Sequence, residues 1–265
     1  MRISLFLSQI KSICNQKNIE LEGAFKTVAE AGVKGVDIHI SSVPFVAENK
    51  ALFEENGLTV NSIIAEYDFV HAYSEALVDK IIDGCKAVGA DNVHLVPVKW
   101  KDDDDRDECV KALVKPLTEA VKKAKENGIA IGIEDYNPHF SVGKSEHLLY
   151  LAENVPDLHI IFDTGNFCYF NEDVFEVYKK LKPYIKKNIH LKDRSQNGRP
   201  DEKPELINGK EVYIVVPGTG DIPIKEVLDD LKASGFEGGI TAELFGSTDS
   251  MTDILASVEF MKQYK

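Results

Sequence analysis

The sequence predicts an α/β fold of the (β/α)₈ type, a TIM barrel, as a single domain over residues 1–265. Three observations support this prediction. Eight short apolar segments alternate with segments of helical periodicity, as in proteins built on parallel strands. The length of 265 residues is close to the usual size of this fold, about 250 residues. The alternative, an open doubly wound sheet, lacks the glycine-rich Gly-x-Gly-x-x-Gly motif after a strand.

The predicted strands are short apolar runs bounded by polar residues or glycine. They cover residues 2–7, 35–40, 58–64, 92–98, 129–135, 159–165, 188–193 and 239–244. The first run belongs to MRISLFLSQIKSIC, in which basic Arg2 precedes the apolar residues. Its apolar stretch is short and is interrupted by Ser4, Ser8 and Gln9. We therefore interpret it as a strand and not as a signal peptide.

The predicted helices repeat apolar residues at intervals of three and four. They cover residues 21–32, 74–90, 108–128, 145–155, 174–185, 223–235 and 252–265. Gly32 and Gly128 end two of them, as glycine often does at a helix C-terminus. The acidic run KDDDDRDE (101–108) precedes the third helix, and we interpret it as a solvated helix N-terminus.

The composition excludes several classes of partner. The net charge of −13 disfavours binding to nucleic acids or to an anionic membrane surface, although a local basic pocket can still bind a small anion. No apolar segment has the length of a membrane span. The four cysteines, which are Cys14, Cys85, Cys109 and Cys168, show no C-x-x-C spacing. We expect reduced thiols in a cytoplasmic protein.

Polar residues at the strand ends predict a metal site. Strand residues of a barrel alternate between the interior and the helix layer. This alternation directs one metal-binding side chain inward from each of four strands, at or near the carboxyl end, namely Glu134, Asp163, His190 and Glu243. The carboxyl ends of the strands hold the active site in such barrels. Three carboxylates and one imidazole suit Mn²⁺, Mg²⁺, Co²⁺ or Zn²⁺.

A purely structural interpretation of these residues is the alternative. Any one of the carboxylates could form a buried ion pair with Lys192 or Arg194. Three carboxylates that converge without a cation would repel one another strongly in a low dielectric. A divalent ion therefore explains the set of four better. The same alternation directs Lys192 into the pocket, where it can meet an anionic or polar substrate.

Five segments carry a family resemblance that extends over essentially the whole chain. They are IGIED (131–135), IIFDTGNF (160–167), NIHLKDR (188–194), VPGTGDIPIKEVLDDL (216–231) and ITAELF (240–245). In this order they resemble the xylose isomerase-like superfamily of sugar phosphate isomerases and epimerases. That superfamily also contains the tagatose and psicose 3-epimerases and the apurinic endonuclease family.

The resemblance implies a role for each of the four residues. Glu134, Asp163, His190 and Glu243 would bind one divalent ion, and the two glutamates would act as an acid/base pair on opposite faces of the substrate. Three positions depart from the family pattern. Asn166 stands where a histidine is usual, and Asp193 and Gln196 stand where the ketose 3-epimerases have glutamate and arginine. The nuclease branch also needs further metal ligands, so a nuclease is disfavoured.

The resemblance and the site together predict a metal-dependent isomerase or epimerase of a small sugar, keto-sugar or polyol, with or without a phosphate. A glutamate would remove a proton next to a carbonyl, and the metal would stabilise the enediolate. A lyase or dehydratase that uses the same site is an open alternative. A barrel that binds sugar without turnover is another, and homo-oligomerisation is left open.

Other residues are expected to contact the substrate. Besides Lys192, the expected contacts are His39, Trp100, Asn166 and Arg194. Phe6 and Glu66 are expected in the pocket walls, and His139 is expected on a surface loop. Residues 195–217 lie beyond a metal-bearing strand and are rich in Pro and Gly, so they form either a lid or a surface hairpin.

Overall fold

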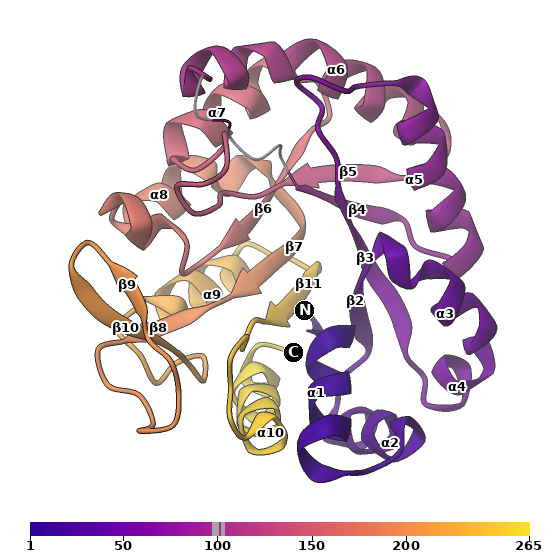
Figure 1. Ribbon diagram of the computed structural model, residues 1–265, viewed down its shortest axis with the longest axis vertical. Helices are drawn as coiled ribbons and strands as arrows, with labels where there is room; N and C mark the ends of the chain where they lie inside the picture. Colours follow the sequence, from indigo (N-terminus) through magenta and orange to yellow (C-terminus); the bar gives the residue numbers. More distant parts are fainter. Residues whose placement is uncertain (97–100, 102–103) are drawn as a thin grey trace.

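The computed structural model describes residues 1–96, 101 and 104–265, and it confirms the predicted barrel (Figure 1). Eight parallel strands close in the order β1-β11-β7-β6-β5-β4-β3-β2. They are β1 (Arg2–Phe6), β2 (Gly35–His39), β3 (Thr59–Glu66), β4 (Asn92–Val96), β5 (Ala130–Ile133), β6 (His159–Asp163), β7 (Ile185–Leu191) and β11 (Gly239–Ala242). Each overlaps one predicted strand. The predicted end of the fourth strand, residues 97–98, lies outside the described residues.

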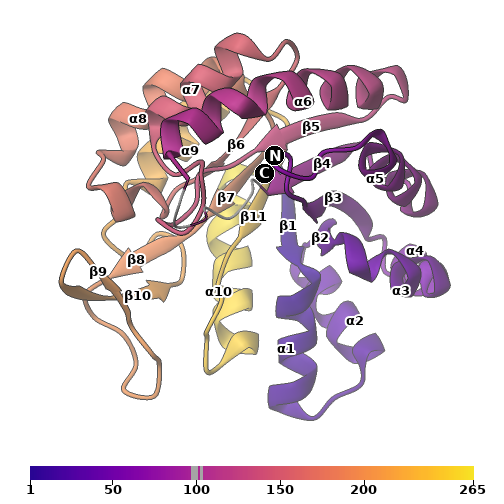
Figure 2. The same cartoon turned by 45° about the horizontal axis from the view of Figure 1, so that its top comes forward.

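Ten α-helices in the described part of the chain surround the barrel (Figure 2). They are α1 (Leu7–Lys17), α2 (Leu21–Ala31), α3 (Val43–Glu48), α4 (Lys50–Glu55), α5 (Glu75–Val88), α6 (Arg106–Glu126), α7 (Ser145–Asn154), α8 (Val174–Leu181), α9 (Ile224–Ala233) and α10 (Ser250–Met261). The 3₁₀ turns are η1 (Ile40–Ser42), η2 (Phe167–Phe170), η3 (Lys182–Tyr184) and η4 (Lys262–Tyr264). None of the helices described has the length and apolarity to cross a lipid bilayer.

Helix α1 was not predicted from the sequence. It begins directly after β1, so the apolar residues of the strand and of the helix form one continuous run. The side chain of Gln9 accepts a hydrogen bond from the Phe6 backbone nitrogen at 3.2 Å. This bond satisfies a backbone donor at the start of the helix, where intrahelical acceptors are absent. Ile10 and Ile13 bury the inner face of α1.

The acidic run before α6 begins a helix, as predicted. The side chain of Asp105 accepts a hydrogen bond from the Glu108 backbone nitrogen at 3.0 Å and caps the helix. Residues 102 and 103 of the run lie outside the described residues.

The barrel interior is polar, whereas the layer between strands and helices is apolar. Asn92 on β4 accepts a hydrogen bond from Nε2 of His159 on β6 at 2.9 Å, which spans the interior past β5. Gly132 on β5 leaves the space for this contact, because a Cβ there would lie 2.3 Å from the imidazole of His159. Outward-facing residues such as Ile131 and Phe162 are fully buried against the helices.

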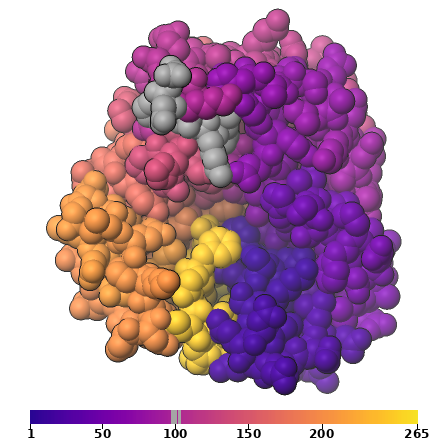
Figure 3. All heavy atoms as spheres, in the orientation of Figure 1, coloured from indigo at the N-terminus to yellow at the C-terminus, as the bar shows by residue number. Residues whose placement is uncertain are grey.

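Residues 195–217 form a hairpin next to the barrel. The strands β8 (Asp193–Ser195), β9 (Glu205–Ile207) and β10 (Lys210–Val215) make an antiparallel sheet in the order β8-β10-β9. Asn208 and Gly209 both have positive φ, 52° and 78°, as a tight hairpin turn requires. Figure 3 shows the hairpin in orange on the same face of the molecule as α10 and the N-terminal helices.

Candidate metal centre

The structure brings together the four residues that the sequence singled out. Glu134 follows β5 directly, Asp163 ends β6, His190 lies in β7 and Glu243 follows β11. One ligand atom from each lies within 4.8 Å of the others, and all four side chains are buried. The four strands therefore place these groups at their carboxyl ends, as the alternation of side chains predicts.

The chemistry of this group fits a divalent cation. Oδ1 of Asp163 accepts hydrogen bonds from the backbone nitrogens of Gly165 and Asn166, at 2.7 and 2.8 Å. Oδ2 accepts no hydrogen bond from the part of the chain that the structure describes, although it lies among buried polar groups. The pKa of Asp163 is raised to about 8, mainly by burial; Lys192 opposes this shift, and the charges of Glu243 and Glu134 add to it. A cation would remove this mutual repulsion.

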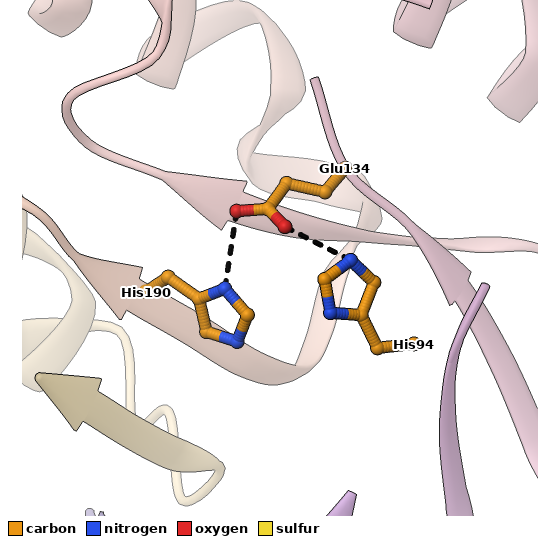
Figure 4. A group of neighbouring side chains, drawn as sticks. All are labelled: His94, Glu134 and His190. Atoms are coloured by element: carbon orange, nitrogen blue, oxygen red, sulfur yellow. Dashed lines mark hydrogen bonds and ion pairs between the residues drawn. The ribbon is translucent and has the colours of Figure 1, made fainter. Parts of the chain in front are cut away.

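Glu134 lies between two histidines (Figure 4). Its Oε1 is 3.0 Å from Nδ1 of His190, and its Oε2 is 2.9 Å from Nε2 of His94 on β4. Burial opposes ionisation of Glu134, but the two imidazoles outweigh it and hold its pKa well below the ordinary value. Burial would lower the pKa of His190, yet Glu134 raises it to about 9.

His94 is a possible metal ligand that sequence reasoning missed. Its ring nitrogen Nε2 also forms a hydrogen bond with the hydroxyl of Tyr136. Burial raises the pKa of Tyr136 well above its ordinary value, and the charge of Glu134 adds to this effect. Tyr136 therefore keeps its proton. With Glu134 and His190, His94 makes a second, overlapping group of three possible metal ligands.

Lys192 points into the site, as predicted. Its Nζ lies 2.5 Å from Oε1 of Glu243, 3.2 Å from Oδ2 of Asp163 and 2.8 Å from Oδ1 of Asn166. Burial would lower its pKa, but Asp163 and Glu243 outweigh burial and raise it. Lys192 is thus a buried cation that pairs with two of the carboxylates. Gly165 permits the close approach, since a Cβ there would lie 2.6 Å from the Lys192 carbonyl oxygen.

Arg194 borders the same cavity and is held by protein groups. Its Nε donates to the carbonyl of Gly165 at 2.8 Å, and one terminal nitrogen donates to Glu205 of the hairpin at 2.8 Å. The other terminal nitrogen lies 3.0 Å from the hydroxyl of Tyr169, which itself donates to Glu205 at 2.6 Å. The hairpin therefore closes one side of the cavity through Glu205.

Asp135 is a further buried carboxyl group beside the site. Neither of its carboxyl oxygens accepts a hydrogen bond from the described residues, whereas its backbone carbonyl accepts one from Nδ2 of Asn166 at 2.9 Å. Burial raises the pKa of Asp135 well above its ordinary value, and the charges of Asp163 and Glu134 raise it further. Burial and the neighbouring carboxylates thus both favour the protonated form of this group.

Three of the four residues, Glu134, His190 and Glu243, line a cavity of about 380 Å³, whereas Asp163 is fully buried and does not line it. Its walls include apolar and polar side chains from many elements, among them Phe6, Glu66, His94, Tyr136, Phe140, Asn166, Tyr169, Lys192, Arg194, Glu205, Ile214 and Phe245. Phe6 and Glu66 thus occupy the predicted walls. Tyr136, Tyr169 and Glu205 had not been singled out from the sequence.

One expected contact, His39, has a different place. His39 is exposed and does not line the cavity; its Nδ1 accepts a hydrogen bond from the Ser41 backbone nitrogen at 3.2 Å. Trp100 lies outside the described residues. His139 is exposed on the loop after β5, as expected for a surface histidine.

The fold and the site define a class of protein: (β/α)₈ barrels with a buried carboxylate and imidazole cluster, suited to a divalent ion, at the carboxyl ends of the strands. Residues 25–264 match the family described as xylose isomerase-like TIM barrel. The chain belongs to this family.

Known proteins similar to this chain include one relative by sequence and two by structure. An inosose dehydratase from Lacticaseibacillus casei is 26% identical over 204 residues, which cover 70% of this chain and 62% of that protein. The structure of the probable 3-DHS dehydratase AsbF from Bacillus anthracis superimposes with a TM-score of 0.77 and 13% identity, over 99% of both chains. The IolI protein, with a bound zinc atom, has a TM-score of 0.75 and 18% identity, over 100% of this chain and 98% of that chain.

Proposed function

We propose that this protein is a metal-dependent lyase that removes water from a small keto-sugar or keto-polyol. One observation carries this proposal: groups able to move a proton stand on two sides of one cavity, next to a candidate metal centre. Lys192 and Glu243 form one group, and Glu134, His94 and Tyr136 form the other. The dehydratase names of the Lacticaseibacillus casei relative and of the Bacillus anthracis structure support the same class of reaction.

The cavity suits a small polyhydroxylated ring. Its floor offers charged and hydrogen-bonding groups for hydroxyls and a carbonyl, whereas Phe6, Phe140 and Phe245 supply apolar surface for the C–H face of a sugar. Phe245 is 46% exposed, so an apolar surface remains open at the cavity. Both features favour a neutral or singly charged sugar derivative as substrate.

The residues of the chain suggest the order of steps. Glu243 takes the proton from the carbon next to the carbonyl, and the C–H electron pair becomes a carbon–carbon double bond while charge moves to the carbonyl oxygen. A divalent ion held by the four ligands would supply Lewis-acid stabilisation of that charge. When the carbonyl forms again, the hydroxyl on the carbon next to the deprotonated carbon leaves. The Tyr136 and His94 pair protonates this hydroxyl, so that it departs as water.

An isomerase or epimerase is the second candidate, because it shares the first proton transfer. Glu134 and Glu243 follow strands β5 and β11, which are separated by β6 and β7 in the barrel. Such a pair could exchange protons with opposite faces of a substrate. The lyase is preferred because Asp193, at the position of the 3-epimerase glutamate, accepts four backbone hydrogen bonds, and Gln196 is exposed.

The two reactions differ in the mass of the product. Purified protein with Mn²⁺ should convert an inosose in D₂O to a product that has lost one water. An epimerase would instead return a product that keeps the water and gains deuterium at the epimerised carbon. Glu243→Gln should abolish either reaction while circular dichroism shows an intact fold. Turnover without loss of water would overturn the lyase, and full activity of Glu243→Gln would remove the assigned base.

A further inference from the structure

The two ring nitrogens of His190 have different surroundings. Nδ1 faces the carboxylates, at 3.0 Å from Oε1 of Glu134 and 3.7 Å from Oε2 of Glu243. Nε2 faces the barrel interior and lies 3.1 Å from the side-chain amide of Asn188. A cation among the carboxylates can bind only Nδ1. A neutral imidazole that binds a metal through Nδ1 must carry its proton on Nε2.

The hydrogen-bond count at Asn188 supports a proton on Nε2. The oxygen and nitrogen of an Asn amide exchange places by a half-turn, so their assignment follows from the partners. With the nitrogen toward His190, the Thr241 hydroxyl would face two acceptors, Asp37 Oδ2 at 2.6 Å and Asn188 Oδ1 at 3.2 Å. A hydroxyl has one proton, so one contact would lack a hydrogen.

The half-turn of the amide gives each of these contacts one donor and one acceptor. The oxygen of Asn188 then accepts the Nε2 proton of His190, and the amide nitrogen donates to the Thr241 hydroxyl. Thr241 in turn donates its single proton to Asp37. All three partners come from different strands, β7, β11 and β2, and each is at most 1% exposed.

Asp37 is itself held in a fixed position. Its other oxygen, Oδ1, accepts a hydrogen bond from Nδ2 of Asn61 at 2.7 Å, and Asn61 Oδ1 accepts one from Arg2. The chain therefore runs from the metal centre through the barrel interior to Arg2 at the opposite end of the strands. Interiors of such barrels are usually filled with branched apolar residues, so a continuous series of hydrogen-bonded polar side chains here calls for an explanation.

We infer that Asn188, Thr241 and Asp37 are positioning residues for the metal centre. They hold the proton of His190 on Nε2 and orient the ring, so that the lone pair of Nδ1 points toward the cation. Partners of this kind around a metal-binding histidine commonly change metal affinity by about 10–100-fold when they are removed. The inference rests on the metal site alone and holds whichever reaction the enzyme performs.

The barrel contains a matched control. Asn92 and His159 form a second buried Asn–His hydrogen bond, 2.9 Å long, on strands β4 and β6. His159 is not one of the metal-binding group. Asn188→Leu and Asn92→Leu therefore remove the same kind of bond from the same interior, one beside the metal centre and one away from it.

The test measures the affinity of the full-length protein for Zn²⁺ by calorimetry with a competing chelator. Asn188→Leu should weaken Zn²⁺ binding by about 10–100-fold, and Asn92→Leu should leave it within about twofold of the wild type. Asn188→Asp keeps an acceptor for the Nε2 proton, and it should bind Zn²⁺ better than Asn188→Leu. If Asn188→Leu does not fold, Thr241→Val breaks the chain one bond further away with little change in shape.

Nuclear magnetic resonance of the zinc-loaded protein, labelled with ¹⁵N at histidine, gives an independent measurement. The His190 signals should show a proton bonded to Nε2 and no proton on Nδ1. A proton on Nδ1 with zinc at Nε2 would overturn the inference. Unchanged Zn²⁺ affinity in both Asn188→Leu and Thr241→Val would overturn it as well. Loss of affinity in Asn92→Leu equal to that in Asn188→Leu would show a general effect of barrel stability instead.

Discussion

Nζ of Lys192 lies 3.2 Å from Oδ2 of Asp163, the oxygen of that carboxylate that accepts no hydrogen bond among the described residues. The two residues sit at the carboxyl ends of neighbouring strands, β7 and β6. An ammonium group and a divalent ion near this oxygen repel each other, because both are positive in a poorly solvated site. The positive charge of Lys192 therefore affects both the binding of the metal ion and the binding of substrate in the pocket.

This relationship predicts opposite effects of Lys192→Met on binding and on turnover. Mn²⁺ should bind at least several-fold more tightly, because a buried positive charge has been removed. Substrate turnover should fall, because the pocket has lost its cation for the carbonyl or hydroxyls. Calorimetry and a product assay measure the two effects. Lys187→Met, on the same strand, is the matched control, and normal turnover in Lys192→Met would show that the lysine is only structural.

The metal centre itself predicts retention of about one divalent ion per chain after purification, and its removal by EDTA. Glu134→Gln, Asp163→Asn and His190→Ala should each retain less metal in elemental analysis after dialysis. Asp135→Asn is a close control, because this neighbouring carboxyl group is not in the metal-binding group and the substitution keeps its shape. Full retention of metal by all three variants would disprove the site.

We predict that the buried imidazole of His159 makes the folded protein less stable in acid. Burial lowers its pKa from 6.5 to about 3, so the folded protein keeps this imidazole neutral while the unfolded chain takes up a proton. Its contribution is fully present above pH 6.5 and decreases by about 1.4 kcal/mol for each pH unit below that, down to about pH 3.

The measurement compares wild type with His159→Asn. The difference in free energy of unfolding, taken from urea titrations, should shift in favour of the variant as the pH falls from 6.5. Since other groups titrate equally in both proteins, the difference isolates His159. A difference that stays constant from pH 7 to pH 4 would mean that His159 is protonated in the folded state.

We predict that Asp193 stabilises the loop before α9. Its carboxylate accepts hydrogen bonds from the backbone nitrogens of Arg194, Gly218, Gly220 and Ile222, at 2.8 to 3.2 Å. Asp193→Ala would leave several of these donors without an acceptor and should lower the free energy of unfolding by about 3 kcal/mol. The exposed Asp201 is the control, and Asp201→Ala should change it by less than about 0.5 kcal/mol.

Alternation of side chains made much of the site predictable. In a strand such as NIHLKD, the two apolar residues face the helices, so the residues between them must point into the barrel. The four candidate ligands were identified in this way. His94 was missed although it obeys the same rule, because the strand 92–98 ends in apolar residues and drew no attention to its interior face. The same rule applied to Asn92 and His94 would have found both.

Other features have no local signal in the sequence. Glu205 reaches Arg194 only because the hairpin folds back over the barrel, and the pairing of β8 with β10 joins residues about twenty positions apart. His39 obeys the alternation but lies at the last residue of β2, where the chain turns into η1 and the rule ends. Helix α1 was hidden because no polar residue or turn separates it from β1.

The pairing of β1 with β11, from Arg2↔Gly239 to Leu5↔Ala242, has a consequence for synthesis on the ribosome. Strand β1 emerges before the other barrel strands, but one of its two edges stays without a partner until residue 242 has left the exit tunnel. At about 5–20 residues per second, the nascent chain carries an open sheet edge for ten seconds or more. Such an edge invites pairing with other chains. During that interval, we expect the nascent chain to depend most on chaperones that cover exposed strands.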